Sequence, residues 1–116
     1  TWPDRVEGCS RTIDWNDLGS LDFEPVDLER YPAIGLAHEV IKVGGTSGTV
    51  INAANEVVVA AFLEHILPFG SMGAIVEEVI AKSTISHLTD FGDVQAADKN
   101  ARAIANELVA SVGVNL

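Results

Sequence analysis

Two amides and a carboxylate are the polar side chains whose spacing could support chemistry in this sequence. Asn52, Asn55 and Glu56 stand at positions i, i+3 and i+4 of an otherwise apolar stretch, so a helix brings them to one face. One interpretation is a short strip that faces the solvent. The other is a buried hydrogen-bonding cluster, which needs specific partners because amides and carboxylates are costly to bury unsatisfied. No nucleophile or metal ligand stands at a spacing that assigns the three a catalytic role.

The other reactive side chains do not form a recognisable site either. His38, His65 and His87 fall on different predicted elements and lack the spacing of metal ligands. The Gly-rich run 44–48 lacks the lysine of a phosphate-binding loop and follows a predicted helix rather than a strand. Cys9 is the only cysteine, so no intrachain disulfide can form, which favours a reducing compartment. We therefore predict no catalytic, cofactor-binding or metal-binding residue in these 116 residues.

The charge of the chain excludes several classes of partner. Seven Lys and Arg stand against seventeen Asp and Glu, which gives a formal net charge of −10, and no basic run exists. Such a surface repels a phosphate backbone and an anionic membrane, so we expect neither nucleic acid nor a membrane as partner. The sequence contains no signal peptide and no spanning segment. Because it begins at Thr1 rather than Met, we expect a piece of a longer protein.

Apolar periodicity predicts four helices, of which the one over 49–67 is central. This stretch is apolar nearly all round, with polar interruptions, which indicates burial among other helices. Its expected inward rows are Val50, Ala54, Val57, Val58 and Ala61, and Ile51, Val59, Phe62 and Ile66. The inward faces expected for the other helices are Ala33, Leu36, Ala37, Val40 and Ile41; Met72, Ile75, Val76, Val79 and Ile80; and Ala97, Ala101, Ile104, Ala105, Leu108 and Val112. Mostly short loops between them favour an antiparallel bundle.

Cap and breaker residues set the predicted helix boundaries. Pro32 suits the first position of the first helix, where its missing N–H costs nothing. Ser71 is a natural N-cap for the third helix, and Asp93 or Asp98 can cap the fourth. The loop 83–92 has no period, and we expect its apolar side chains to tuck beneath it: Ile85, Leu88 and Phe91.

Residues 1–31 differ from the rest of the chain because they hold both Trp residues and many acids and have no helical period. Apolar residues alternate with acids at 13–15 and 21–23, which predicts two short strand-like pieces joined by a turn. We therefore predict an extended connector over 1–31 that packs on something else, and a helical bundle domain over 32–116. The predicted fold class is all-α: a small antiparallel four-helix bundle preceded by an extended connector with short strand-like pieces.

Several segments, taken together and in order, resemble the C-terminal part of the 1-deoxy-D-xylulose 5-phosphate reductoisomerase family. Asn52-Ala53-Ala54-Asn55-Glu56 is the most specific of these segments. The others are Trp2-Pro3-Asp4-Arg5, Asp14-Trp15, Leu21-Asp22-Phe23-Glu24-Pro25, Asp27-Leu28-Glu29-Arg30-Tyr31-Pro32, Leu36-Ala37, Ala60-Ala61-Phe62-Leu63, and Asp98-Lys99-Asn100-Ala101-Arg102 with Ala105 and Glu107. The match covers essentially the whole chain.

The resemblance implies a parent enzyme that converts 1-deoxy-D-xylulose 5-phosphate to 2-C-methyl-D-erythritol 4-phosphate in the non-mevalonate isoprenoid pathway. It implies NADPH and a divalent metal, Mg or Mn, as cofactors of the parent, and a homodimer in the cytoplasm, or in the plastid for a plant-type source. The partners of this chain would be the missing NADPH-binding and catalytic domains. None of the family's recognised ligands maps onto this chain, so we expect the 116 residues alone to be non-catalytic.

The role that the resemblance implies is support: the bundle braces the catalytic domain, and the connector runs to it from that domain's edge. Trp2 and Pro3 would then lie nearest the missing active site. The resemblance favours the buried interpretation of the polar cluster, with partners in the loop 44–49 or near Arg30 and Tyr31. The alternative is a stand-alone acidic helical interaction module, while a small independent enzyme would need a site that the sequence lacks.

Overall fold

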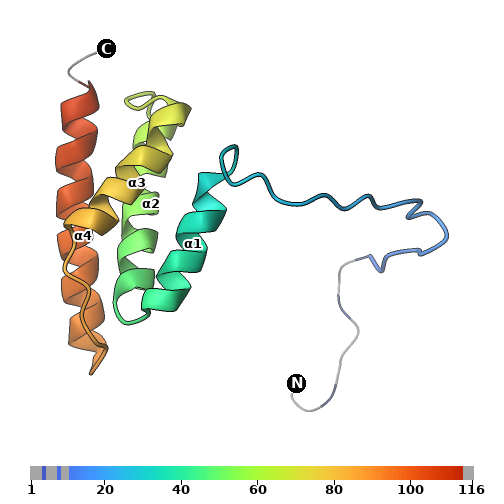
Figure 1. Cartoon of the computed structure of the whole chain (residues 1–116), viewed down its shortest axis with the longest axis horizontal. Helices are drawn as coiled ribbons and strands as arrows, with labels where there is room; N and C mark the ends of the chain where they lie inside the picture. The colour runs from blue at the N-terminus through green and yellow to red at the C-terminus, as the bar shows by residue number, and fades with distance from the viewer. Residues whose placement is uncertain (1–3, 5–7, 9–10, 114–116) are drawn as a thin grey trace.

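The computed structural model describes residues 4, 8 and 11–113, so Trp2, Pro3 and Cys9 lie outside the described residues. The helices are α1 (Pro32–Val43), α2 (Ser47–Leu63), α3 (Met72–Lys82) and α4 (Phe91–Gly113), with the short 3-10 turn η1 (Phe69–Ser71) before α3 (Figure 1). No strand forms within the described ranges. The prediction of an all-α fold with four packed helices is confirmed.

Helix α2 is the centre of the bundle because each of the other three helices makes its largest helix contact with it. Its contact with α4 is the most extensive, and alanines are buried on both helices. Small side chains allow the two helix axes to approach closely. The buried hydrophobic core consists of Val50, Ala53, Ala54, Val58, Ala61, Leu67, Ile75, Val76, Val79, Ala101, Ala105 and Val109.

The inward faces predicted for α3 and α4 are confirmed, since each of their residues is buried or packed against the core. The face predicted for α1 is only partly right. Leu36 packs against the core, but Ala33, Ala37 and Ile41 are exposed. Helix α1 contains no buried residue at all, because it meets α2 and α3 along a narrow strip.

Helix α2 ends four residues earlier than predicted, at Leu63, because His65 adopts a left-handed conformation with φ of 60°. The N–H of Ile66 then donates back to Ala61 O at 2.9 Å, and the N–H of His65 donates to Phe62 O at 3.0 Å. These two bonds form a Schellman cap with histidine in the position where glycine is usual. Ile66, predicted to face inward, is consequently 44% exposed beyond the helix end.

Two loops that are far apart in the sequence are joined by a reciprocal pair of hydrogen bonds. The N–H of Thr46 donates to Ser86 O at 3.0 Å, and the N–H of Ser86 donates to Thr46 Oγ1 at 3.0 Å. The Ser47 hydroxyl donates to Val40 O or Gly44 O at the end of α1. Thr46 and Ser47 are both buried. Their hydroxyls therefore join elements, and the N-cap Thr46 makes no side-chain capping bond at the start of α2.

The start of α4 is capped by Asp90, not by Asp93 or Asp98 as predicted. Asp90 Oδ1 accepts from the N–H groups of Gly92 and Asp93 at 2.6 and 3.2 Å. Asp93 Oδ2 accepts in return from the N–H groups of Thr89 and Asp90 at 2.7 and 3.1 Å. This reciprocal arrangement is a capping box in which aspartate replaces the usual glutamate.

The helix cap also fixes the loop before α4. Of the three loop side chains predicted to be tucked in, only Ile85 packs on the core, whereas Leu88 and Phe91 are exposed. Helix α4 begins at Phe91, two residues before the earliest predicted cap. The first turn of the helix therefore carries this phenylalanine out into the solvent.

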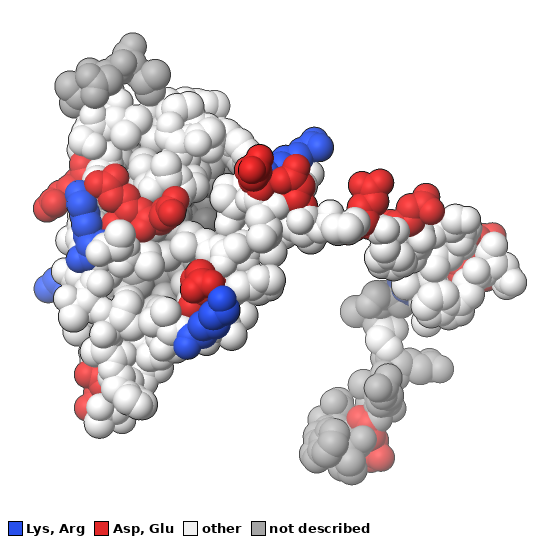
Figure 2. Space-filling model, in the orientation of Figure 1, with Lys and Arg blue, Asp and Glu red and all other residues white. Residues whose placement is uncertain are grey.

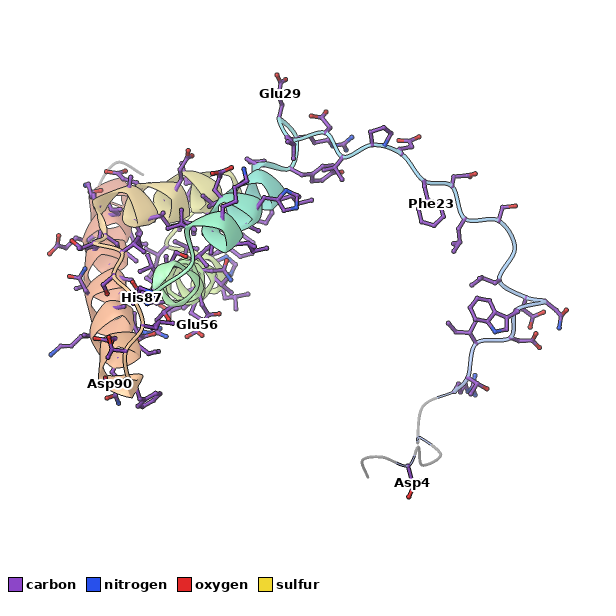
Figure 3. All side chains as sticks on the ribbon, turned by 60° about the horizontal axis from the view of Figure 1, so that its bottom comes forward. Asp4, Phe23, Glu29, Glu56, His87 and Asp90 are labelled. Atoms are coloured by element: carbon purple, nitrogen blue, oxygen red, sulfur yellow. The ribbon has the colours of Figure 1, made fainter. Side chains whose placement is uncertain are left out.

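The connector residues 11–31 extend away from the helices (Figures 1 and 3). All of residues 11–31 are exposed, and Trp15 and Phe23 are 76% and 89% exposed. A turn forms at Asp14–Asp17, where the N–H of Asp17 donates to Asp14 O at 3.1 Å. The first predicted strand-like piece, 13–15, overlaps this turn, and within the described residues neither piece forms a ladder, since a strand needs a second strand to pair with. The division of the chain into two units at residue 31 stays a prediction, although α1 begins at Pro32 as expected.

Candidate functional site

The three polar residues predicted as a cluster on α2 are all exposed, so the prediction that they are buried is wrong for this chain. Asn52 Nδ2 donates to Glu56 Oε1 at 2.9 Å, which follows from their i, i+4 spacing. Asn55 takes no part in this bond. The partners predicted in the loop 44–49 and near Arg30 are not found among the described residues.

The partner that the sequence did not reveal is Arg102, on the neighbouring helix α4. Its Nη2 donates to Glu56 Oε2 at 2.7 Å, and its Nε donates to Asp98 Oδ2 at 2.8 Å. Asn52, Glu56, Asp98 and Arg102 together form a set of side chains that we call the α2–α4 polar network. The pairing of Asp98 with Arg102 follows from their i, i+4 spacing, but the contact with Glu56 spans 46 residues and has no local signal.

The electrostatics of the network favour its charged form. The hydrogen bond from Arg102 lowers the pKa of the Glu56 carboxyl below its ordinary value, and the bond from Asn52 adds to this effect. Asp98, and then Glu56, raise the pKa of the Arg102 guanidinium. The side chains of Arg102 and Glu56 are 36% and 54% exposed, so water screens the attraction and its contribution to stability is small. Because a general base works best with a pKa near the operating pH, a lowered pKa makes Glu56 poorly suited to acid–base catalysis.

Two open hollows flank the α2–α4 polar network along the seam between the two helices. One is lined by Gly48, Thr49, Asn52, Phe91, Val94, Gln95 and Asp98. The other is lined by Glu56, Val57, Ala60, Ala61, Glu64, Ile66, Arg102, Asn106 and Val109. Both open to solvent, and within the described part of the chain no group of three or more His, Cys, Asp and Glu residues could hold a metal ion. The arrangement links two helices and brings no reactive groups together.

Among the described residues, the basic side chains do not gather into a cluster on the face that Figure 2 draws. Figure 2 shows acidic side chains on both the connector and the helices, with the basic side chains scattered on this face. Lys42 and Lys82 pair with Glu39 and Glu78 one turn earlier on their own helices. Of the described helices, none is long and apolar enough to cross a membrane.

Comparison with known proteins gives a consistent family. The family model for the DXP reductoisomerase C-terminal domain matches residues 1–104. The 1-deoxy-D-xylulose 5-phosphate reductoisomerase of Pseudomonas paraeruginosa is 37% identical over 106 residues, which are 91% of this chain and 27% of that enzyme. The enzyme of Rhodospirillum centenum is 41% identical over 110 residues, which are 95% of this chain and 27% of that enzyme.

Solved structures give the same likeness. The reductoisomerase of Zymomonas mobilis in complex with NADPH has a TM-score of 0.82 and 42% identity, covering 93% of this chain and 29% of that one. A reductoisomerase in complex with magnesium has a TM-score of 0.80 and 28% identity, covering 96% of this chain and 30% of that one. The chain therefore spans less than a third of the length of the relatives that it matches.

Proposed function

The chain belongs to the DXP reductoisomerase C-terminal domain family, and we propose that it supports the catalytic part of a 1-deoxy-D-xylulose 5-phosphate reductoisomerase without carrying catalytic residues. The observation that carries the proposal is the family match over residues 1–104, within relatives more than three times as long. The parent enzyme converts 1-deoxy-D-xylulose 5-phosphate to 2-C-methyl-D-erythritol 4-phosphate with NADPH and Mg or Mn. The NADPH and magnesium named for the solved relatives support this choice of cofactors.

The internal construction of the bundle suits a supporting role. The Thr46–Ser86 bonds tie the two loops together, and the α2–α4 polar network bridges the two helices that share the largest contact. The connector carries exposed aromatic side chains, which we assign to contact with the catalytic domain. By the same resemblance the parent is a homodimer in the cytoplasm, or in the plastid in a plant-type source, and Trp2 and Pro3 lie nearest its active site.

The test is NADPH oxidation measured with 1-deoxy-D-xylulose 5-phosphate and Mg²⁺, for the isolated residues 1–116 and for the longer protein that contains them. We expect turnover by the longer protein and none by the isolated chain. Turnover by the isolated chain would refute the assignment of catalysis to other domains. A longer protein that folds and binds NADPH but does not turn over the substrate would refute the assigned reaction.

A second candidate is a stand-alone acidic helical interaction module, favoured by the exposed apolar side chains of the connector and of α1. The two functions differ in what removal of the domain does. A module with its own partner predicts that the remaining protein keeps its full activity when residues 32–116 are deleted. A supporting domain predicts that the activity falls.

A further inference from the structure

Helix α1 has apolar side chains on two opposite sides, and the bundle covers only one of them. Leu36 and Val40, four residues apart, are half-buried on the side that meets α2 and α3. Ile34 and Ile41, seven residues apart, share the other side and are 38% and 77% exposed. A helix that is apolar on both sides is normally covered on both sides. The outward side of α1 therefore lacks its covering partner in the described structure.

The connector carries further exposed apolar side chains between residue 21 and the start of α1. Leu21, Phe23, Leu28 and Tyr31 are each at least half exposed, and the segment that carries them runs into α1 (Figures 1 and 3). Leu21 and Phe23 alternate with acids in the sequence, so an extended path would place the two kinds of side chain on opposite sides. Among the described residues, no hydrogen bond links 21–24 to the helices. Single exposed apolar residues are ordinary, but a series of this length along one segment favours an interaction surface.

The structural likeness to complete reductoisomerases includes this connector. Residues 32–113 account for 82 of the 116 residues, whereas the match to the Zymomonas mobilis enzyme covers 93% of the chain. The match must therefore extend well beyond the helices into residues 1–31. An extended segment without contacts to the bundle has nothing within the described residues to hold its path. Its path is explained if the remainder of the enzyme supplies the contacts.

We propose that residues 21–31 and the outward side of α1 form one continuous docking surface for the NADPH-binding and catalytic part of the reductoisomerase. This rests on the proposed function and adds to it which face of the bundle is covered. The covering surface has apolar pockets spaced for Leu21 and Phe23, as in the recognition of an extended peptide, and then a groove for Ile34 and Ile41. It has a basic rim, because Asp22, Glu24 and Glu29 form no ion pair among the described residues.

The seam between α2 and α4 is the competing surface, and its side chains argue against it. The charged groups there are already paired with one another at 2.7–2.8 Å. Covering them would remove water from ion pairs that are now half-exposed, at a desolvation cost that the outward side of α1 does not carry. Phe91, which lines a hollow on this seam and is 71% exposed, offers a matched control for Ile41.

The test compares Ile41→Asp with Phe91→Asp in the complete reductoisomerase and in the isolated residues 1–116. Aspartate in the first turn of α4 suits a helix start, so Phe91→Asp should fold normally. In the isolated chain, both variants should leave the melting temperature near that of the parent. In the complete enzyme, Ile41→Asp should lower kcat/KM about tenfold or more and increase cleavage by protease between connector and bundle. Phe91→Asp should change neither.

Hydrogen exchange separates the failure of this proposal from the failure of the proposed function. The α1 amides should exchange at least about tenfold more slowly in the complete enzyme than in the isolated chain. Equal exchange of the α1 amides in the complete enzyme and the isolated chain would overturn the docking surface and leave the proposed function standing. Slower amide exchange around Phe91 instead, with a loss of kcat/KM in Phe91→Asp, would do the same. So would an isolated chain that dimerises and becomes monomeric with Ile41→Asp. A complete protein with protected α1 but no reductoisomerase activity would overturn the function alone.

Discussion

Replacement of Gly45 by alanine should destabilise the bundle by more than backbone strain alone. Gly45 has φ of 56°, so alanine there incurs the cost of a left-handed conformation, about 1 kcal/mol. Gly44 has φ of 67° and ψ of −153°, a region that glycine alone adopts readily, so alanine there incurs about 1–3 kcal/mol of strain. Only at position 45 would the new methyl group meet an obstacle. It would lie well inside van der Waals contact with the backbone oxygen of Ser86, whereas nothing lies within 4 Å at position 44.

The obstacle is backbone, so the loop that carries Ser86 must move to relieve it. That movement breaks the two hydrogen bonds, each 3.0 Å long, between Thr46 and Ser86. Thr46 is fully buried, and each bond is worth about 1 kcal/mol net, with more lost if a buried group stays unsatisfied. Gly45→Ala should therefore cost about 3 kcal/mol or more when the loss of both bonds is added to the strain. Gly44→Ala, whose new methyl group meets no obstacle, should cost only the backbone strain of about 1–3 kcal/mol.

The assay is urea unfolding of residues 1–116 followed by far-ultraviolet circular dichroism, with the free energy of unfolding extrapolated to water. Left-handed strain alone predicts a cost of about 1 kcal/mol for Gly45→Ala, so any larger cost reports the collision with Ser86. Thr46→Val keeps the shape of the side chain and removes the hydroxyl that accepts from the N–H of Ser86. This change should lower the free energy of unfolding by about 1–3 kcal/mol and tests the same pair of loops independently. If Gly45→Ala costs no more than about 1 kcal/mol, the reciprocal bonds contribute nothing measurable and the reasoning fails.

Three further outcomes can be measured by the same unfolding assay. His65→Gly should raise the free energy of unfolding by about 0.5–1 kcal/mol, since glycine adopts positive φ without strain; a lower value would contradict the left-handed cap. Asp90→Ala should lower it by about 1 kcal/mol through loss of the α4 N-cap, and an unchanged value would mean that the cap is not formed in solution. Backbone donors lower the pKa of Asp93, and Arg102 lowers the pKa of Glu56. The stability that the two ionised carboxylates provide is therefore present above their ordinary pKa values of 3.8 and 4.5. It is lost as the pH falls through the lower pKa values of the folded state. Asp93→Asn should therefore flatten the fall of stability below about pH 5, and an unaltered pH profile would refute this linkage.

The sequence correctly predicted the helix faces that follow from local periodicity. The faces of α3 and α4 were predicted correctly because each meets the core along one stripe of apolar residues at helical spacing. The face of α1 was only partly predicted, because a helix with apolar residues on two sides gives no local sign of which side faces the bundle. The early end of α2 was missed because its left-handed residue is His65, whereas the usual sequence signal for a helix end is glycine.

Contacts between residues far apart in the sequence limited how much of the candidate site could be predicted. Arg102 lies 46 residues from Glu56, and Ser86 lies 40 residues from Thr46, so neither pairing could be inferred from spacing along one helix. The resemblance favoured burial of the two amides and the carboxylate with partners in nearby loops, because the spacing gave no sign of Arg102. The structure satisfies Asn52 and Glu56 at the surface instead. The family resemblance was predictable because the motif 52–56 stands in sequence among other matching segments, and the comparisons confirm it.

The proposed role of this domain is to support catalysis carried by other parts of the enzyme. Deletion of residues 32–116 from the complete reductoisomerase, with the connector kept, tests it most directly through kcat/KM for 1-deoxy-D-xylulose 5-phosphate with NADPH and Mg²⁺. We predict that the truncated protein still binds NADPH, because no ligand for it is assigned to the bundle, while kcat/KM falls at least about a hundredfold, which corresponds to about 2.7 kcal/mol of lost transition-state stabilisation. A truncated enzyme with unchanged kcat/KM would contradict the account.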